Sequence, residues 1–506
     1  MATSYPRVAS FHSARAMTEH LNSLGWSLPI DEQILTAPSS PLAQPVEIPW
    51  QGGSRRIGNR FAVQPMEGWD GEADGRPSAL TRRRWLRFAV SGAKLIWGGE
   101  AVAVLPDARA NPNQLWLNDR TAASFEALRQ DFVKVHRERF GRENDLLIGL
   151  QLTHSGRFCH PHEKSLPEPV IAYHHPILDK KFGVAPHQPP VSDQELARIV
   201  RAFGEAARLA QAAGFDFVDL KHCHGYLGHE FLSAFERPGP YGGGFENRTR
   251  LLRELIAAVR DTAPGLEVGV RLSAYDTVPF MEDPKDGQGR PVEVSAHLPY
   301  RWGFGVDQLA PTLPDLTETK TLLSLLFSLG IRLVNITASS PYYAPHLTRP
   351  ALFPPCDGYL PPEDPLEGTA RLQSVTRELK ATVPKMVFVS SGWSYFQNFL
   401  PHLGQALVRE GWTDFVGLGR MMLSYPDFPA DVLEKGRLDP KRICRTFSDC
   451  TNGPRNGMIS GCYPLDPFYK ARPEAEKLKA IKLRHNKKLQ PAEVAHETKY
   501  PGGHAG

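Results

Sequence analysis

The sequence predicts an α/β protein of the (β/α)8 TIM-barrel class, and three observations lead to this prediction. From residue 60 onward, eight short apolar runs alternate with amphipathic stretches, which is the order of a barrel of parallel strands covered by helices. No G-x-G-x-x-G turn follows the first run, although a doubly wound dinucleotide-binding sheet would want one there. Polar side chains gather where several runs end, and the carboxyl ends of barrel strands form the catalytic face.

The predicted strands are short and mostly apolar throughout, as strands covered on both faces should be. They are Arg60–Met66, Leu95–Val104, Leu146–His154, Phe215–Lys221, Glu267–Ser273, Leu333–Ala338, Met386–Gly392 and Phe415–Arg420. The stretches between them carry apolar residues at three- and four-residue intervals, which predicts helices. These are Thr81–Ala93, Ala122–Phe140, Asp193–Ala213, Arg248–Thr262, Leu316–Leu329, Thr369–Thr382, Phe396–Glu410 and the shorter Pro426–Lys435.

Three long segments follow strand ends, at 155–191, 274–315 and 339–367. Loops in that position normally build pockets and lids. We expect residues 1–50 to be an N-terminal extension rich in Pro and Ser, residues 51–470 the barrel, and residues 471–506 a polar tail without a core of its own.

Composition and charge narrow the function classes. A hydrophobic fraction of 41% and a charged fraction of 23% are those of a soluble globular protein. The net charge of +4 is too weak to favour nucleic-acid binding. No apolar run approaches the roughly 20 residues of a membrane span. Six cysteines and an N-terminus without an apolar signal segment favour a reducing, cytoplasmic location. We expect a small-molecule substrate and no membrane partner; a homo-oligomer is compatible with the sequence.

The fourth predicted strand ends in an unusual cluster. Lys221, His222, His224 and Tyr226 follow an apolar run within six residues. A buried strand does not normally end in an ammonium, two imidazoles and a phenol. The cluster therefore indicates a catalytic mouth.

Two further strand ends predict a phosphate site. The eighth strand ends in Gly419-Arg420 and the seventh in Ser391-Gly392. Glycines let backbone N–H groups approach a phosphate, arginine adds a bidentate donor, and barrels place phosphate sites after strands 7 and 8. Gln151, His154 and Arg271 end strands 3 and 5 on the same face, and a buried Arg271 needs an anionic partner.

These motifs together closely resemble the Old Yellow Enzyme superfamily, the FMN-dependent barrels that include NADH:flavin oxidoreductases and the barrel of 2,4-dienoyl-CoA reductases. The resemblance rests on PM after strand 1, QLTHSGR after strand 3, VDLKHCHGYL and YGGGFENR after strand 4, VGVRLS on strand 5 and VGLGR on strand 8. It covers roughly residues 45–470. It implies an oxidoreductase that passes hydride from NADPH or NADH through FMN to an activated C=C bond.

The resemblance also implies roles for single residues. Pro65, Met66 and Glu67 would lie at the flavin ring, Ala101 near its pyrimidine side and Gln151 at the pyrimidine edge. Arg271 would lie at N1/O2, where a cation stabilises the reduced flavin. The phosphate would be held by Gly392, Gly419 and Arg420, with Ser391 in the same site.

The substrate clamp of the family is a pair of side chains three positions apart after strand 4, followed by a tyrosine. Here these positions are Lys221, His224 and Tyr226. Lys221 and His224 would donate hydrogen bonds to the substrate, and Tyr226 would be the proton donor. His222 is expected to be structural.

Three features depart from the family pattern. Lys221 stands where the family has histidine, and its point charge suits a more anionic acceptor. Glu67 stands where the family usually has Thr or Cys, beside flavin O4/N5. The segment 239–244 lacks the usual Asn, Arg and Asp before YGG.

The C-terminal cysteines resemble an incomplete 4Fe–4S motif. Cys444, Cys450 and Cys462 remain, but Phe447 takes the second ligand position and one residue is missing. Since such clusters need four cysteines, we predict a vestigial site and no metal.

Other functions stay open at this point. The same scaffold supports flavin-dependent reduction or oxidation of aromatic or amine substrates. Lys221 could instead form a Schiff base in a flavin-free, aldolase-type barrel. The chain could also be a flavin-binding barrel without catalytic turnover.

Overall fold

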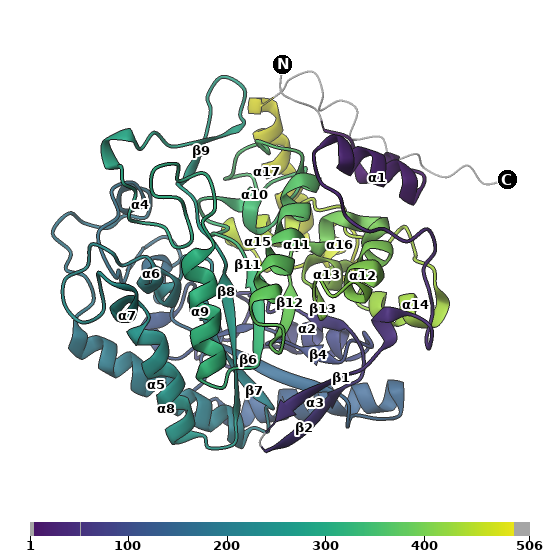
Figure 1. Ribbon diagram of the computed structural model, residues 1–506, viewed down its shortest axis with the longest axis horizontal. Helices are drawn as coiled ribbons and strands as arrows, with labels where there is room; N and C mark the ends of the chain where they lie inside the picture. The colour runs from purple at the N-terminus through teal and green to yellow at the C-terminus, as the bar shows by residue number, and fades with distance from the viewer. Residues whose placement is uncertain (1–4, 51, 490–506) are drawn as a thin grey trace.

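The computed structural model describes residues 5–50 and 52–489 and confirms the (β/α)8 barrel (Figure 1). All pairs in the barrel are parallel, in the order β4-β3-β13-β12-β11-β8-β7-β6, and β4 also pairs with β6, which closes the barrel. The strands are β3 (Phe61–Val63), β4 (Leu95–Ile96), β6 (Leu147–Thr153), β7 (Phe217–His222), β8 (Glu267–Ser273), β11 (Leu333–Thr337), β12 (Val387–Ser390) and β13 (Phe415–Leu418).

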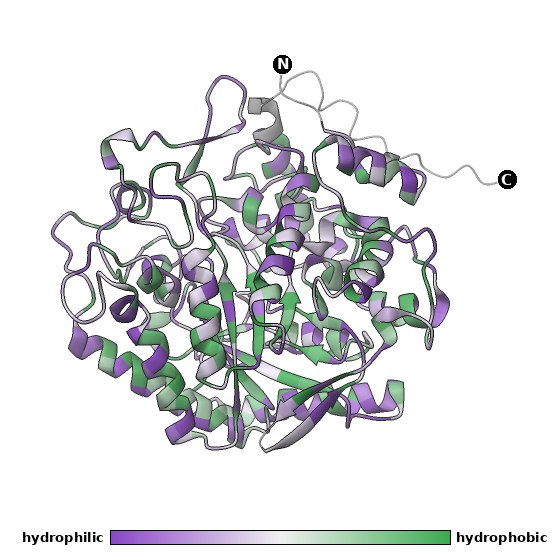
Figure 2. Ribbon diagram, in the orientation of Figure 1, coloured by the Kyte–Doolittle hydropathy of each residue, from purple (hydrophilic) through white to green (hydrophobic). Residues whose placement is uncertain are grey.

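Helices cover the barrel from outside, with their apolar faces inward (Figure 2). They are α2 (Ala79–Ala89), α3 (Ala122–Phe140), α5 (Asp193–Ala212), α8 (Arg250–Thr262), α9 (Thr317–Ser328), α11 (Pro365–Thr382), α12 (Leu400–Arg409) and α14 (Phe428–Lys435). Local chemistry sets their ends: the Ser192 hydroxyl caps α5 by accepting from the Glu195 N–H, and α3 ends at Gly141 in the left-handed conformation.

The second predicted strand is divided. Leu95–Val104 forms two strands, β4 and β5 (Ala101–Ala103), because Gly98 and Gly99 bend the chain between them. Gly99 has φ +55°, and a Cβ there would lie 2.5 Å from the Trp85 ring, so only glycine fits. This bend carries the chain across the barrel mouth.

The lower end of the barrel is closed by a hairpin of β1 (Val46–Trp50) and β2 (Gly53–Ile57) (Figure 1). Ile48 and Ile57 are buried in one cluster with Leu95, Leu147 and Phe217 from the barrel interior. The expected boundary at residue 50 therefore falls inside a hairpin. Within the extension, α1 (Ala14–Ser23) buries Met17 and Leu21 in the main core.

The insertions lie at the other end of the barrel. They contain α4 (Leu178–Lys181), the β9–β10 hairpin (Phe280–Glu282 and Gly289–Pro291) and α10 (Pro345–Thr348). The loop after strand 4 forms α6 (Leu227–Leu232) and α7 (Phe245–Arg248), and α13 (Arg420–Ser424) follows β13.

The C-terminal part differs from the expected polar tail. After α15 (Asp449–Arg455) and α16 (Pro467–Lys470), residues Pro473–Leu489 form α17. Leu478 is buried against Tyr463 and Tyr469, and Lys482 pairs with Asp449 at 2.7 Å. Single apolar residues at helical spacing give this segment a small core that its average polarity hides. Residues 490–506 lie outside the described residues, and no described helix is both long and apolar enough to cross a membrane.

Candidate active site

A cavity of about 250 Å³ opens where the barrel strands end. Side chains from the ends of β3, β6, β7, β8, β12 and β13 line it, together with residues of the 339–367 segment and of α15. It is therefore at the carboxyl-terminal face, where barrel active sites lie.

Most of the sequence-predicted site residues meet in this cavity. Its lining includes Pro65, Met66, Glu67, Gln151, Lys221, His224, Tyr226, Arg271, Ser391, Gly392, Gly419 and Arg420. Ala101 is the exception: its side chain is buried, it does not line the cavity, and its carbonyl accepts from Gln114 Nε2 at 3.1 Å. The neighbouring Glu100 contributes to the site through its carboxylate, which accepts from the Gly68 N–H at 2.6 Å. This hydrogen bond fixes the turn that carries Glu67.

A buried carboxylate orients the side chains on one wall. Asp219 on β7 accepts hydrogen bonds from Gln151 Nε2 at 2.5 Å, Trp97 Nε1 at 2.7 Å and the Arg271 N–H at 2.6 Å. Burial raises the pKa of Asp219 to about 6, and these donors oppose the rise. Because Asp219 takes one N–H of the Gln151 amide, the second N–H and the carbonyl oxygen are left for a ligand.

The ends of β12 and β13 form a cradle with close backbone approach. A Cβ on Gly417 would lie 2.1 Å from Gln64 Nε2 and 2.3 Å from the Ser390 carbonyl. Gln64 in turn bonds Asn335 Oδ1 and Ser391 Oγ, each at 3.2 Å. Arg420 Nη2 donates to the Pro350 carbonyl at 2.9 Å, while its Nη1 is buried without a partner.

Glu67 is the centre of the opposite wall. Its Oε1 accepts from Lys221 Nζ at 2.6 Å, and both oxygens accept from the Tyr226 hydroxyl at 3.0 and 2.9 Å. Trp69 Nε1 donates to Oε2 at 2.9 Å. Lys221 Nζ also lies 3.4 Å from the centre of the Tyr226 ring. The ammonium is therefore paired with a carboxylate in this structure.

His224 faces the cavity as a neutral imidazole. Its backbone has φ +67°, its N–H donates to Ser273 Oγ at 3.1 Å, and its Nε2 is buried without a partner. Burial, with Arg271 and Lys221 nearby, lowers the pKa of His224 well below its usual value. A strained, unpartnered side chain is typical of a ligand-binding position.

His222 and His154 do not line the cavity. His222 Nδ1 contacts the Leu220 carbonyl at 3.2 Å, and its ring packs on Gly228 of α6. His154 Nδ1 accepts from the Gly156 N–H at 3.1 Å. Burial lowers the pKa of each to about 4. Both histidines therefore have a structural role.

The NADH:flavin oxidoreductase / NADH oxidase family profile matches residues 44–298, about half of the chain. The chain belongs to this family. The resemblance inferred from the motifs is thereby confirmed, and family membership implies FMN with NADH or NADPH as its reductant.

The curated relatives include an NADPH dehydrogenase of Bacillus cytotoxicus, 39% identical over 44% of this chain and 60% of that protein. The flavin oxidoreductase hxnT of Emericella nidulans is 27% identical over 57% of this chain and 66% of that protein. In both, the match spans less than two thirds of the relative.

Solved structures agree in fold. A 2-naphthoyl-CoA reductase complex superposes with a TM-score of 0.61 at 16% identity, covering 86% of this chain and 58% of that one. An old yellow enzyme homologue from Zymomonas mobilis gives 0.53 at 21% identity, covering 79% of this chain and 94% of that one.

The polar groups that line the cavity fit FMN. Arg271 Nε, Arg420 Nη1 and His224 Nε2 are buried polar atoms without partners, and such atoms need a ligand. The glycine-lined cradle beside Arg420 suits the phosphate, and the Gln151 wall suits the ring edge.

Several lining residues were missed in the sequence. Arg349 and Arg455 reach the cavity from the 339–367 segment and from α15, and Tyr342 stacks on Phe158 at 4.2 Å between ring centres. Burial, with Arg420 nearby, lowers the pKa of Arg349 to about 10. No local pattern marks these residues, because long insertions bring them to the mouth.

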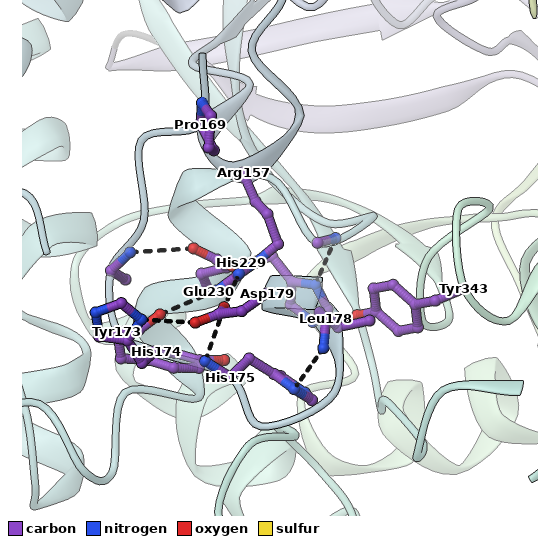
Figure 3. Close-up of polar contacts among 12 residues, drawn as sticks. Arg157, Pro169, Tyr173, His174, His175, Leu178, Asp179, His229, Glu230 and Tyr343 are labelled. Atoms are coloured by element: carbon purple, nitrogen blue, oxygen red, sulfur yellow. Dashed lines mark hydrogen bonds and ion pairs between the residues drawn. The ribbon is translucent and has the colours of Figure 1, made fainter. Parts of the chain in front are cut away.

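A buried polar network around Arg157 and Glu230 holds the 155–191 insertion (Figure 3). Arg157 donates to Glu230 Oε1 at 2.5 Å, to the Tyr173 carbonyl at 2.9 Å and to Asp179. Glu230 lies on α6, which starts directly after Tyr226. The network therefore ties the insertion that carries Phe158 to the helix that positions the phenol.

The three C-terminal cysteines line a separate small cavity of about 20 Å³ behind Arg420. Burial raises the pKa of the Cys444 and Cys462 thiols, and Cys450 also reaches the main cavity. In the described ranges, no three or more His, Cys, Asp or Glu side chains are grouped to hold a metal ion. A vestigial cluster site stays our interpretation of this region.

Proposed function

We propose that the protein is an NAD(P)H-dependent FMN oxidoreductase that reduces the activated C=C bond of an unsaturated carbonyl compound or acyl thioester. The observation that carries the proposal is the meeting of Lys221, His224 and Tyr226 in one cavity with the cradle in which Arg420 Nη1 has no partner. When bound, FMN supplies the acceptance of hydride from NAD(P)H and its donation to the substrate.

Different residues would bind different parts of the cofactor. Arg420, Gly419, Gly392 and Ser391 would hold the phosphate, and Gln151 the ring edge. Arg271 would stabilise negative charge at N1/O2. Pro65, Met66 and Glu67 would lie along the ring. Ala101 acts at most through the backbone of its strand, since it does not reach the cavity.

The substrate would be held opposite this surface. The free Nε2 of His224 and the remaining N–H groups of Lys221 would donate to the carbonyl oxygen and stabilise enolate charge. Tyr226 would protonate the carbon beside it. The rings of Trp69, Tyr226 and Tyr342 line the cavity and favour a flat, conjugated acceptor, so aromatic substrates are the second candidate.

The Schiff-base alternative fits less well. A Schiff base needs a neutral amine, whereas Lys221 is paired with Glu67 at 2.6 Å and its side chain is 3% exposed. A flavin-free enzyme would also leave the unpartnered Arg271 and Arg420 atoms without an FMN group to bind.

Anaerobic stopped-flow reduction tests the function. The FMN-loaded protein is mixed with NADPH or NADH, and reoxidation is then followed with enones, acyl-CoA thioesters, aromatic acyl thioesters and dioxygen. In a separate arm, the protein with oxidised flavin is mixed with amines, and reduction of the flavin is followed. We expect reduction by a nicotinamide and reoxidation by at least one conjugated acceptor. Reduction followed by reoxidation with dioxygen alone would contradict the proposal and favour a non-catalytic flavin binder.

Tyr226→Phe tests the proton donor. It removes the acid but keeps the ring, so we expect reoxidation by the acceptor to slow about 100-fold or more, while reduction by NAD(P)H proceeds at nearly the wild-type rate. Equal loss in both half-reactions would refute the assignment of Tyr226.

A further inference from the structure

The environment of Tyr226 opposes the loss of its proton. The phenol is 1% exposed, and its hydroxyl lies 3.0 and 2.9 Å from the two oxygens of Glu67. Burial, together with the Glu67 charge, raises the pKa of Tyr226 well above that of an ordinary phenol. A tyrosinate formed beside a carboxylate in a poorly solvated site is strongly repelled. Tyr226 can therefore give a proton to a substrate only if its oxygen receives another in the same step.

A hydrogen-bonded row leads to that oxygen. Lys221 Nζ lies 2.6 Å from Glu67 Oε1, and Glu67 contacts the Tyr226 hydroxyl. Trp69 Nε1 holds the other carboxylate oxygen at 2.9 Å, and the Gly68 N–H is fixed by Glu100 at 2.6 Å. The carboxylate is thus held between an ammonium that has a proton to release and a phenol that needs one.

The other charged and titratable groups that face this row do not supply a proton. They are Tyr342, whose hydroxyl is 3.1 Å from that of Tyr226, Cys223 and His224 beside Lys221, Arg271 on β8, and Arg349 and Arg455 beside Tyr342. The three arginines stay protonated near neutral pH and do not supply a proton. Burial raises the pKa of Tyr342, raises that of Cys223 to about 12, and keeps His224 neutral. The Lys221–Glu67 pair is the remaining source among the described residues.

We propose that Lys221 and Glu67 form a proton relay that replaces the proton given up by Tyr226. The Tyr226 O–H first turns from Glu67 toward the substrate. In one step the substrate C–H bond then forms as the Tyr226 O–H bond breaks, Lys221 Nζ passes a proton to Glu67, and Glu67 passes a proton to the phenol oxygen. The step leaves Tyr226 neutral, Glu67 a carboxylate and Lys221 a neutral amine, which one solvent proton recharges through the cavity mouth.

This relay rests on the proposed function, which supplies the hydride and its electron pair. It also accounts for the proton that reduction of a C=C bond by NAD(P)H consumes. Lys221 keeps its place in the substrate clamp, because an ammonium has three N–H donors and Glu67 takes one.

Lys221→Arg is the sharpest test. Arginine keeps the charge and the ion pair with Glu67 but cannot release a proton. Glu67→Gln keeps hydrogen bonding to Tyr226 but cannot carry a proton. We expect each to slow reoxidation of the reduced enzyme about 100-fold or more with an acceptor that the wild type uses. The rate of reduction by NAD(P)H, measured on the same samples, shows whether a substitution has damaged the protein in general.

A variant beside the row separates a relay from a structural role. Trp69→Phe removes one hydrogen bond from the Glu67 carboxylate without interrupting the row, so it should slow reoxidation much less than Glu67→Gln does.

A readout without flavin completes the test. In FMN-free protein, ultraviolet titration of the tyrosinate, taken as the difference from Tyr226→Phe, should show Tyr226 ionising at lower pH in Glu67→Gln than in the wild type. An unshifted titration would overturn the coupling, whether or not the proposed function holds. Normal reoxidation in Lys221→Arg and Glu67→Gln beside a slow Tyr226→Phe would overturn the relay and leave the proposed function intact.

Discussion

Three guanidinium groups face the cavity without a carboxylate partner in the described part of the chain: Arg271, Arg349 and Arg420. By contrast, the buried Arg84, Arg157 and Arg248 have carboxylate partners. Since a buried cation without a counter-charge is costly, these three positions mark where an anionic ligand belongs.

Replacing Arg420 by Ala should weaken FMN binding about 10- to 100-fold, the value of a charged hydrogen bond to phosphate. Binding is measured by quenching of flavin fluorescence in FMN-free protein. Riboflavin, which lacks the phosphate, should bind wild type and variant alike. Arg442→Ala is the matched control, because Arg442 pairs with Asp427 at 2.6 Å and does not line the cavity. Equal FMN affinity in Arg420→Ala would remove the phosphate role.

The strand-end residues could be predicted from the sequence, because the strand pattern places Gln151, Lys221, Arg271 and Arg420 on one face. The pairing of Lys221 with Glu67 could not, since 154 residues separate them and a side-chain partner is not set by strand order. The same holds for Asp219, which looked like an ordinary strand residue and proved to orient Gln151 and Trp97.

At the level of elements, all eight strand positions and all eight main helices lie where periodicity predicted them, and β8 has the predicted bounds. The differences occur where a tertiary contact overrides the pattern. The bend at Gly99 follows from its contact with Trp85. The helix expected from Phe396 begins at Leu400, because Gln397 has φ +49° and ends a preceding 3-10 turn. The division into residues 1–50, 51–470 and 471–506 stays a prediction.

The Arg157 network should hold the 155–191 insertion as a unit. Arg157→Gln leaves Glu230 and Asp179 without their buried partner, which should cost about 3 to 5 kcal/mol and open the insertion to limited proteolysis. In Arg208→Gln the lost pair with Glu205 is surface-exposed, so the cost should be at most about 1 kcal/mol. Equal melting temperatures and cleavage patterns for the two variants would show that the network does not hold the loop.

For the molecule as a whole, buried neutral histidines should make the fold sensitive to acid. Burial lowers the pKa of His136, His154 and His222 to about 4 and of His229 and His346 to about 3. Between pH 6.5 and 4 the unfolded chain takes up these protons and the folded chain does not, so stability falls as the pH falls. Asp219 and Asp276, with pKa raised to about 6, and Glu100, with pKa raised to about 7, act in the opposite direction, but they are fewer than the five histidines.

Thermal unfolding followed from pH 7 to pH 4.5 should therefore show a melting temperature that declines steadily toward acid. His136→Gln, which can keep its hydrogen bonds but does not titrate, should flatten part of this decline. A melting temperature that rises or stays constant in this range would contradict the prediction that the histidines outweigh the carboxyl groups.

The hairpin that closes the lower end of the barrel has a kinetic consequence. Ile48, Ile57 and the cluster beneath the strands seal that side, so under the proposed function the nicotinamide and the electron acceptor both arrive by the loop-lined entrance. The two compounds then compete for the same space and must take turns. The steady-state rate should accordingly show parallel double-reciprocal plots, and an excess of either compound should inhibit the other.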